Sequence, residues 1–229
     1  MNIADNLKII NENIARAAQK SGRQATDITL VAVTKSVSPQ VLQSHLDVLL
    51  ANGVCNFGEN RAQELTAKQP FCGDNVIWHM IGHLQRNKVR NVVGRVALIH
   101  SLDSLRLAEE ISRIAVRENV VADVLIEVNI AGEDTKHGIT PGEAVAFADE
   151  AAKLPNINIK GLMTIAPFVD DAEENRPHFQ EMARLFALLK ANGHDMRHLS
   201  MGMTADYEVA IEEGATIVRI GTAIFGERA

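Results

Sequence analysis

Lys35 is the residue of this chain whose type and position most directly suggest covalent chemistry. It ends the segment Thr-Leu-Val-Ala-Val-Thr-Lys, whose β-branched and apolar residues predict a buried strand over 29–33. A lysine beside an apolar strand is expected to lose solvation, which favours the neutral amine that forms imines with carbonyl compounds. The alternative is a lysine that merely ends a strand in solvent. Lys136 is its closest rival, because Lys160 lies inside a later predicted strand.

Two segments near the C-terminus could bind an anion. The first contains Ser200 and Gly202 and leads into a helix predicted to begin near Thr204. In the second, Gly221 lets the backbone approach a ligand, and Thr222 can cap a helix or donate to a phosphate. Amides at a helix N-terminus favour anions. Each segment alone could be ordinary helix capping, whereas the two together favour a phosphate site.

The elements that position these residues follow from the period of the chain. Residues 3–17 carry apolar side chains at helical spacing and predict an amphipathic helix. Eight short apolar runs follow, separated by helical patterns: Thr29–Val33, Val54–Phe57, Val76–Met80, Ala97–His100, Val121–Val128, Ile157–Leu162, Met196–Leu199 and Thr216–Ile220. Strands that alternate with helices pair in parallel. We predict an α/β fold, a single (β/α)₈ TIM barrel domain over residues 1–229 with an extra N-terminal helix. A doubly wound sheet is the alternative, but no Gly-x-Gly-x-x-Gly follows the first strand.

A barrel would bring the candidate residues to one end. Functional groups of such barrels follow the C-terminal ends of the strands, and phosphate sites follow strands seven and eight. Arg219 lies within the eighth predicted strand, where alternation directs its side chain into the barrel, as for Gly221. A buried arginine must be paired or hydrogen-bonded, so it serves either a structural ion pair or a ligand.

The composition restricts the class of protein. A formal net charge of −6 over 229 residues disfavours broad nucleic-acid or membrane surfaces. No apolar run reaches the roughly 20 residues of a membrane span, and the N-terminus does not have the pattern of a signal peptide. Cys55 and Cys72 are expected to be reduced thiols. These features predict a cytoplasmic protein.

Several motifs combine into a resemblance that spans nearly the whole chain: Val-Thr-Lys at 33–35, Phe-Gly-Glu-Asn at 57–60, His-Met-Ile-Gly-His-Leu-Gln-Arg-Asn-Lys at 79–88, Leu-Ser-Met-Gly-Met at 199–203 and Val-Arg-Ile-Gly-Thr-Ala-Ile-Phe-Gly at 218–226. The chain thereby resembles the pyridoxal phosphate homeostasis protein family. The resemblance implies a barrel of the alanine-racemase N-terminal type that binds pyridoxal 5′-phosphate (PLP), with Lys35 as the Schiff-base lysine. It also implies roles for five other residues: Ser200, Gly221 and Thr222 in a phosphate cradle, Arg219 beside the pyridine ring, and Asn60 beside the cofactor. One departure is Arg61, where the family often has an aromatic residue.

A PLP site could serve a carrier or an enzyme. An arginine keeps the pyridine nitrogen unprotonated, which makes the ring a weaker electron sink. A two-base racemase needs a second acid/base, which in alanine racemases is a tyrosine from a C-terminal domain of the partner subunit. The sequence ends soon after Gly226, so no such domain is expected, and the single tyrosine, Tyr207, is expected to pack a helix. We therefore expect no catalytic residue and a protein of vitamin B6 homeostasis that holds and delivers PLP through a reversible lysine aldimine. A PLP-dependent amino-acid racemase or related enzyme is the alternative.

Partner expectations follow from the same analysis. The proteins that receive PLP are expected to be PLP-dependent apo-enzymes. The chain is expected to bind neither nucleic acid nor membrane and to be a monomer. The basic stretch from Arg86 to Arg95 is expected to be a solvated helix face or a contact for a partner or an anion. His79, His83 and His100 have no metal-ligand spacing and are expected to be core or surface residues, so no metal site is predicted.

Overall fold

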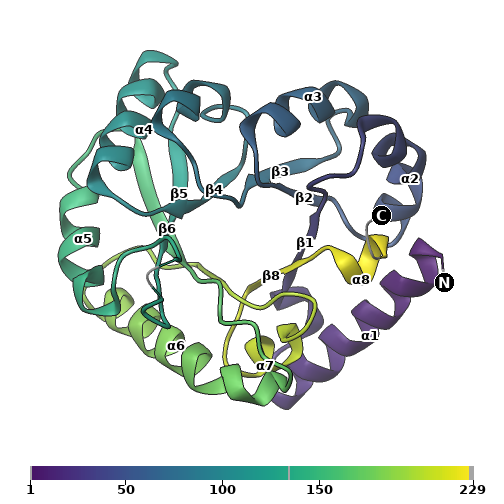
Figure 1. The fold of residues 1–229 in the computed structure, drawn as a ribbon. Helices are drawn as coiled ribbons and strands as arrows, with labels where there is room; N and C mark the ends of the chain where they lie inside the picture. The colour runs from purple at the N-terminus through teal and green to yellow at the C-terminus, as the bar shows by residue number, and fades with distance from the viewer. Residues whose placement is uncertain (1, 134, 227–229) are drawn as a thin grey trace.

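Eight parallel strands form a closed barrel in the computed structural model, which describes residues 2–133 and 135–226 (Figure 1). Each strand pairs with the next along the chain, and the last pairs with the first. The strands are β1 (Thr29–Val33), β2 (Asn56–Glu59), β3 (Ile77–Met80), β4 (Leu98–Leu102), β5 (Ala122–Glu127), β6 (Ile157–Met163), β7 (His198–Ser200) and β8 (Ile217–Ile220). This closed order confirms the predicted (β/α)₈ barrel and excludes the doubly wound sheet.

Helices surround the barrel (Figure 1). The α-helices are α1 (Ile3–Lys20), α2 (Pro39–Ala51), α3 (Ala62–Cys72), α4 (Leu105–Arg117), α5 (Ala144–Ala151), α6 (Arg176–Ala191), α7 (Tyr207–Glu212) and α8 (Thr222–Phe225). Short 3₁₀ helices are η1 (Ala25–Asp27), η2 (Arg86–Asn91), η3 (Pro141–Glu143) and η4 (Ala172–Asn175). Between β3 and β4 the helical segment is η2, which carries most of the basic stretch.

The predicted N-terminal helix is confirmed and extends to Lys20. Asn2 caps it, because its side chain accepts a hydrogen bond from the Asp5 amide at 2.9 Å. Its apolar stripe is buried against α2, α7 and α8. In the part of the chain that the structure describes, no helix has the length and apolar content needed to cross a bilayer.

Most strand boundaries lie within two residues of the prediction, and two of the differences have a clear local reason. The second strand begins at Asn56, two residues late, because the Val54 amide donates to the carbonyl of Leu49 at 2.9 Å and so closes the end of α2. The helix expected near Thr204 begins at Tyr207. There the Asp206 side chain accepts from the Met203 amide at 2.7 Å, which holds the intervening residues in a turn.

The barrel interior contains an apolar ring and, on the same side-chain alternation, polar residues. The ring consists of the buried side chains Val31, Leu98, Leu125, Met163 and Ile217, and it is separate from the larger core between the strands and the helices. Because alternate residues of a strand point to the same side, two positions further along several of these strands also face the interior. His100, Glu127 and Arg219 occupy such positions.

Candidate functional site at the C-terminal end of the barrel

Lys35 lies at the mouth of the barrel, in the turn that follows β1. Its position at the strand end is as predicted, but its side chain is exposed, so the expected loss of solvation beside the strand is wrong for this structure. The next residue, Ser36, has φ of 64°, a left-handed conformation that is uncommon outside glycine. The turn is therefore held in an unusual shape directly after Lys35.

A buried ionic cluster holds this turn from below. Lys68 on α3 donates to the carbonyl of Thr34 at 2.8 Å, to Glu59 at 2.7 Å and to Glu64 at 3.1 Å. Glu64 also accepts from the Ser36 amide at 2.9 Å, and the Thr34 hydroxyl donates to Glu59. Burial raises the pKa of the Glu59 carboxyl, although Lys68 and Thr34 favour its charged form. Thr34 and Ser36, the two neighbours of Lys35 in the chain, are thus both bound to one ionic cluster, which was not predicted from the sequence.

Gly221 and Thr222 lie beside Lys35 because β8 pairs directly with β1. Ala32 is the register partner of Ile220, so the chain leaves both strands at nearly the same height. Gly221 is buried and precedes α8, and Thr222 is exposed as its first residue. The amides of Ile224 and Phe225 donate to the Gly221 carbonyl at 2.9 and 3.0 Å, whereas those of Thr222 and Ala223 have no acceptor among the described residues and are available to a ligand at this edge.

Ser200 and Arg219 lie deeper in the barrel than Gly221. Both are buried, and Arg219 points into the interior as predicted. One of its guanidinium nitrogens donates to the Ser200 hydroxyl at 2.6 Å, and the other donates to the Thr164 carbonyl at 2.8 Å. The predicted need for a buried arginine to be paired or hydrogen-bonded is therefore met here by hydrogen bonds to uncharged groups.

From Ser200 a chain of hydrogen bonds crosses the barrel. Its hydroxyl lies 3.0 Å from His100 Nδ1, His100 Nε2 lies 2.9 Å from His79 Nδ1, and His79 Nε2 lies 3.0 Å from Asn56 Oδ1. Arg219 can only donate and the Asn56 oxygen can only accept. The one consistent arrangement therefore runs from Arg219 to Asn56, with Ser200 and both imidazoles each accepting from one neighbour and donating to the next.

Burial keeps both imidazoles of this chain neutral. It lowers the pKa of His79 to about 4 and that of His100 well below its ordinary value, with a smaller contribution from neighbouring positive charge. Arg219 is also desolvated, which lowers its pKa to about 10, while the charges of Glu127 and Asp206 raise it. Arg219 is consequently a cation at neutral pH.

Glu127 ends β5 and faces the same interior. It is buried, and one of its carboxylate oxygens has no hydrogen-bond partner among the described residues. Burial raises its pKa to about 7, the negative charge of Asp103 adds to this rise, and Arg219 opposes it. Glu127 is therefore the group of this interior that can change charge near neutral pH.

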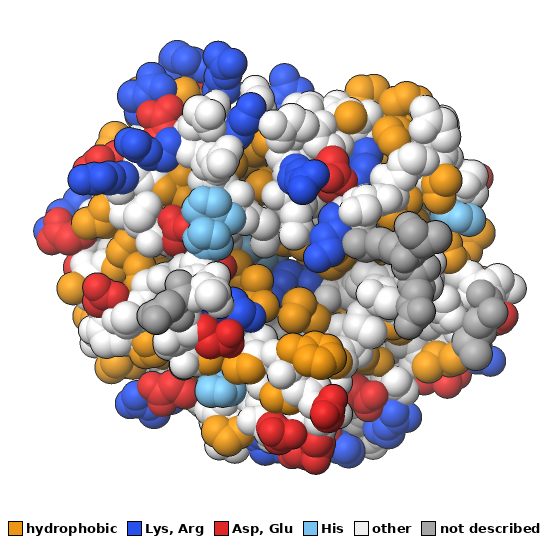
Figure 2. All heavy atoms as spheres, in the orientation of Figure 1, with side chains coloured by type: hydrophobic (Ala, Val, Ile, Leu, Met, Phe, Trp, Pro, Cys, Tyr) orange, Lys and Arg blue, Asp and Glu red, His pale blue; other side chains and the backbone are white. Residues whose placement is uncertain are grey.

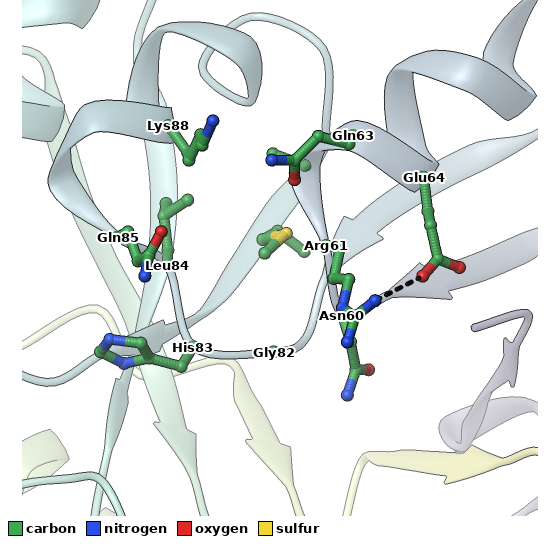
Figure 3. A pocket seen from close by; sticks show the side chains of 11 residues that line it. Asn60, Arg61, Gln63, Glu64, Gly82, His83, Leu84, Gln85 and Lys88 are labelled. Carbon is green, nitrogen blue, oxygen red and sulfur yellow. Dashed lines mark ion pairs between the residues drawn. The ribbon is translucent and has the colours of Figure 1, made fainter. Parts of the chain in front are cut away.

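Asn60 lies at the end of β2 and lines an adjoining pocket of about 680 Å³ (Figure 3). The pocket extends to His83, Gln85 and Lys88 on the segment after β3. Gly82 allows the two segments to touch, because a Cβ atom there would lie 2.5 Å from the carbonyl oxygen of Asn60. Asn60 is thus close to the mouth, in a pocket with its own polar lining.

The face that carries the mouth is hollowed at its centre, and histidine side chains lie beside the hollow (Figure 2). His83 Nδ1 lies 3.0 Å from Asp103 Oδ2, and the His83 and His137 rings are stacked with centroids 3.9 Å apart. From the sequence, His83 is expected to be an ordinary core or surface residue, and Asp103 and His137 have no predicted role.

Other residues singled out from the sequence lie apart from Lys35. Lys160 forms an ion pair with Asp195 at 2.6 Å, and Lys136, in the segment after β5, lines a separate small pocket with residues that follow β6 and β7. Tyr207 is buried, and its hydroxyl accepts from Asn13 of α1 at 2.9 Å, which is the packing role expected for it. Cys55 and Cys72 are free thiols, as expected.

Comparison with known proteins shows similarity over the whole chain. Residues 6–229 match the family "Alanine racemase, N-terminal domain". The chain is 44% identical over 230 residues to a pyridoxal phosphate homeostasis protein of Aquifex aeolicus (strain VF5), covering 100% of this chain and 99% of that protein. Among solved structures, an unknown protein from Bifidobacterium adolescentis has a TM-score of 0.90 and 38% identity, covering 97% of this chain and 94% of its own. PipY of Synechococcus elongatus PCC7942, in a structure with PLP bound, has a TM-score of 0.83 and 31% identity, covering 98% of this chain and 100% of its own.

Proposed function

This chain belongs to the alanine racemase N-terminal domain family, among its pyridoxal phosphate homeostasis proteins, and we propose that it holds PLP reversibly on Lys35. PLP supplies an aldehyde that condenses with a lysine amine and releases water. The supporting relative is PipY, whose structure contains PLP. The function proposed is the storage and delivery of PLP in vitamin B6 homeostasis.

The observation that carries this proposal is the pairing of β1 with β8. It brings the Lys35 amine to the same edge as Gly221, the Thr222 hydroxyl and the backbone amides of Thr222 and Ala223. PLP requires an amine that reacts with its aldehyde and hydrogen-bond donors that bind its phosphate, and this edge of the barrel offers both. These residues therefore fit the cofactor, with the amine and the phosphate donors on neighbouring strand ends.

The structure gives different reasons for assigning Arg219, Asn60 and Ser200 to the cofactor site. Arg219 is a positioned interior cation, and we assign it to the pyridine side of the cofactor. Asn60 is assigned to the rim. Ser200 is assigned to the phosphate side because it ends β7, the strand next to β8. Its hydroxyl, however, already accepts from Arg219 and donates to His100. Its support for the phosphate is thus the weakest of the three.

The carrier function is favoured over amino-acid racemisation by two features. The cation at Arg219 disfavours protonation of a pyridine nitrogen, which weakens the ring as an electron sink. The tyrosine of this chain lies between α7 and α1 with its hydroxyl bound by Asn13, so it does not offer a second acid/base at the mouth. Cytoplasmic location, a monomeric state and apo-enzyme recipients stay predictions.

Absorption spectroscopy tests the proposal. Protein loaded with PLP should show the visible band of the lysine-bound cofactor, and borohydride should abolish the band and fix the cofactor to Lys35. Lys35→Ala should lose the band, whereas the matched variant Lys136→Ala should keep it. An unchanged band in Lys35→Ala would move the attachment elsewhere, and racemisation of alanine or another common amino acid at enzymatic rates would overturn the carrier function.

A further inference from the structure

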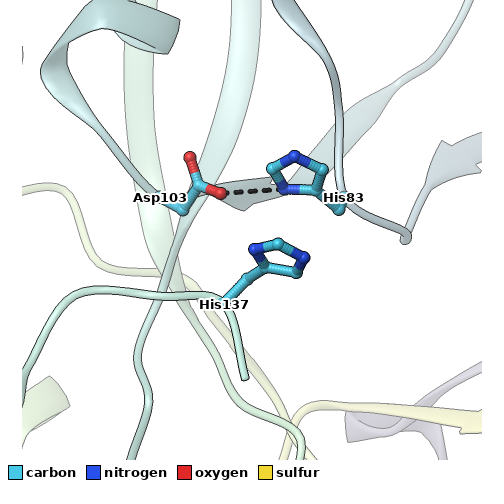
Figure 4. A group of neighbouring side chains, drawn as sticks. All are labelled: His83, Asp103 and His137. Carbon is cyan, nitrogen blue, oxygen red and sulfur yellow. Dashed lines mark ion pairs between the residues drawn. The ribbon is translucent and has the colours of Figure 1, made fainter. Parts of the chain in front are cut away.

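Three side chains from three successive strand ends meet on the rim of the barrel (Figure 4). His83 follows β3, Asp103 follows β4, and His137 lies in the segment after β5. His83 Nδ1 and Asp103 Oδ2 are 3.0 Å apart, and the two imidazole rings stack at 3.9 Å with an interplanar angle of 12°. One ligand atom of each residue lies within 4.8 Å of the other two. The rim thus gathers two imidazoles and one carboxylate at one point.

This set of groups has the chemistry of a three-residue metal site. Imidazole and carboxylate ligands suit divalent ions such as Zn²⁺, Co²⁺ and Ni²⁺. Ligand atoms at roughly 2.0–2.2 Å from a zinc ion lie about 3–3.5 Å from one another, so the present spacing needs only a small closure. The stacked rings must tilt, because each nitrogen lone pair lies in its own ring plane. Both histidines are exposed on loops, where this rotation meets little packing.

The charge of the surroundings also favours a cation. Asp103 is only 12% exposed, and its negative charge acts on the buried carboxyl of Glu127. Glu127 has an oxygen without a partner among the described residues. A carboxylate with so little access to water is stabilised by a positive ion beside it. His83 partly meets this demand through its contact with Asp103, and a divalent ion would meet it further.

We propose that His83, Asp103 and His137 bind one divalent transition-metal ion, with Zn²⁺ as the probe. Three protein ligands leave at least one coordination position open. That position faces solvent at the rim, next to the pocket that Asn60 and Lys88 line. The site is separate from Lys35 and does not depend on the proposed function.

Calorimetric titration of the untagged protein with Zn²⁺ tests this site. We expect one ion per chain, and a dissociation constant at least about tenfold weaker in His83→Ala and His137→Ala. His194→Ala is the matched control, since His194 also lies 3.0 Å from a carboxylate, that of Asp149, but is not part of the three-residue group. Its titration should equal that of the wild type. Co²⁺ should give a visible d–d spectrum in the wild type that His137→Ala lacks.

Lys35→Ala separates the metal site from the cofactor, because bound PLP could itself chelate a metal. Zinc binding that persists in this variant supports the rim site, and binding that disappears overturns it. The absence of stoichiometric binding in the wild type, or unchanged binding in both rim-histidine variants, also overturns it. Because His137 is exposed, its replacement should leave the melting temperature unchanged, which confirms that any loss of binding is local.

Discussion

Replacing Lys68 by methionine is expected to destabilise the fold by about 3–5 kcal/mol at neutral pH, because it breaks a buried ion pair. The Lys68 and Glu59 side chains are 3% and 0% exposed, and the ammonium donates to three oxygens. Methionine fills similar volume but leaves the Glu59 charge without its cationic partner, with the Thr34 hydroxyl still donating to it, and it leaves the Thr34 carbonyl with the Val37 amide at 3.0 Å. The turn that carries Lys35 should loosen as a consequence, since both of its anchors depend on this cluster.

The destabilisation caused by Lys68→Met should increase with pH. Burial already raises the pKa of Glu59, and removal of Lys68 should raise it further. A carboxyl with a raised folded pKa contributes stability that is present below its unfolded pKa and lost as the pH rises through the folded pKa. The deficit of Lys68→Met should therefore be smaller at about pH 5 and larger at about pH 8.

Urea unfolding at several pH values measures this deficit. Lys153→Met is the control, because Lys153 pairs with Glu150 at 2.6 Å with more than half of each side chain exposed, and its loss should stay within about 0.5 kcal/mol. Adding Glu59→Gln to Lys68→Met should recover part of the stability, since no buried charge is left unpaired. A deficit below about 1 kcal/mol, or one that does not grow with pH, would refute the reasoning.

Two further predictions concern the barrel interior. The first concerns Glu127, whose pKa rises from the ordinary 4.5 to about 7 in the folded protein. The free energy of unfolding of the wild type should fall by up to about 3 kcal/mol as the pH rises through this range, and that of Glu127→Gln should not show this fall. Equal pH profiles of the two proteins in unfolding experiments would contradict this prediction. Ser200→Ala should cost about 1–3 kcal/mol, because Arg219 loses an acceptor and His100 loses a donor, and an unchanged denaturation midpoint would show that this hydrogen bond has no net effect.

The fold could be predicted because its signals are local. Each strand is a short apolar run, and parallel pairing follows from the helices between the runs. The errors were local too. Val54 is β-branched and adjacent to the strand, but its amide serves the end of α2. Thr204 precedes a helix by three residues because Asp206 forms the turn, a competition that propensity alone does not resolve.

The site could be predicted only where chain order determines position. Lys35, Gly221 and Thr222 follow the ends of neighbouring strands, so the topology brings them together. The contacts of Ser200 with His100 depend on the register and stagger of strands far apart in the sequence. Alternation along β3 and β4 was a usable signal, since it directs His79 and His100 inward. The exposure of Lys35 depends on the shape of its turn, for which the sequence has no comparable signal.

The hydrogen bonds from Arg219 to Asn56 have a single orientation, and this limits how the barrel interior responds to a change of pH. The imidazole protons cannot reverse without leaving an unprotonated His79 Nε2 facing the Asn56 oxygen, which can only accept, so this line of groups behaves as a fixed dipole. Its imidazoles keep their charge state across the neutral range, while Glu127 on β5, the neighbour of the strand that carries His100, changes its own. The barrel interior therefore contains a line of groups whose charge does not change near neutral pH and one carboxyl whose charge does, with Arg219 in electrostatic contact with both.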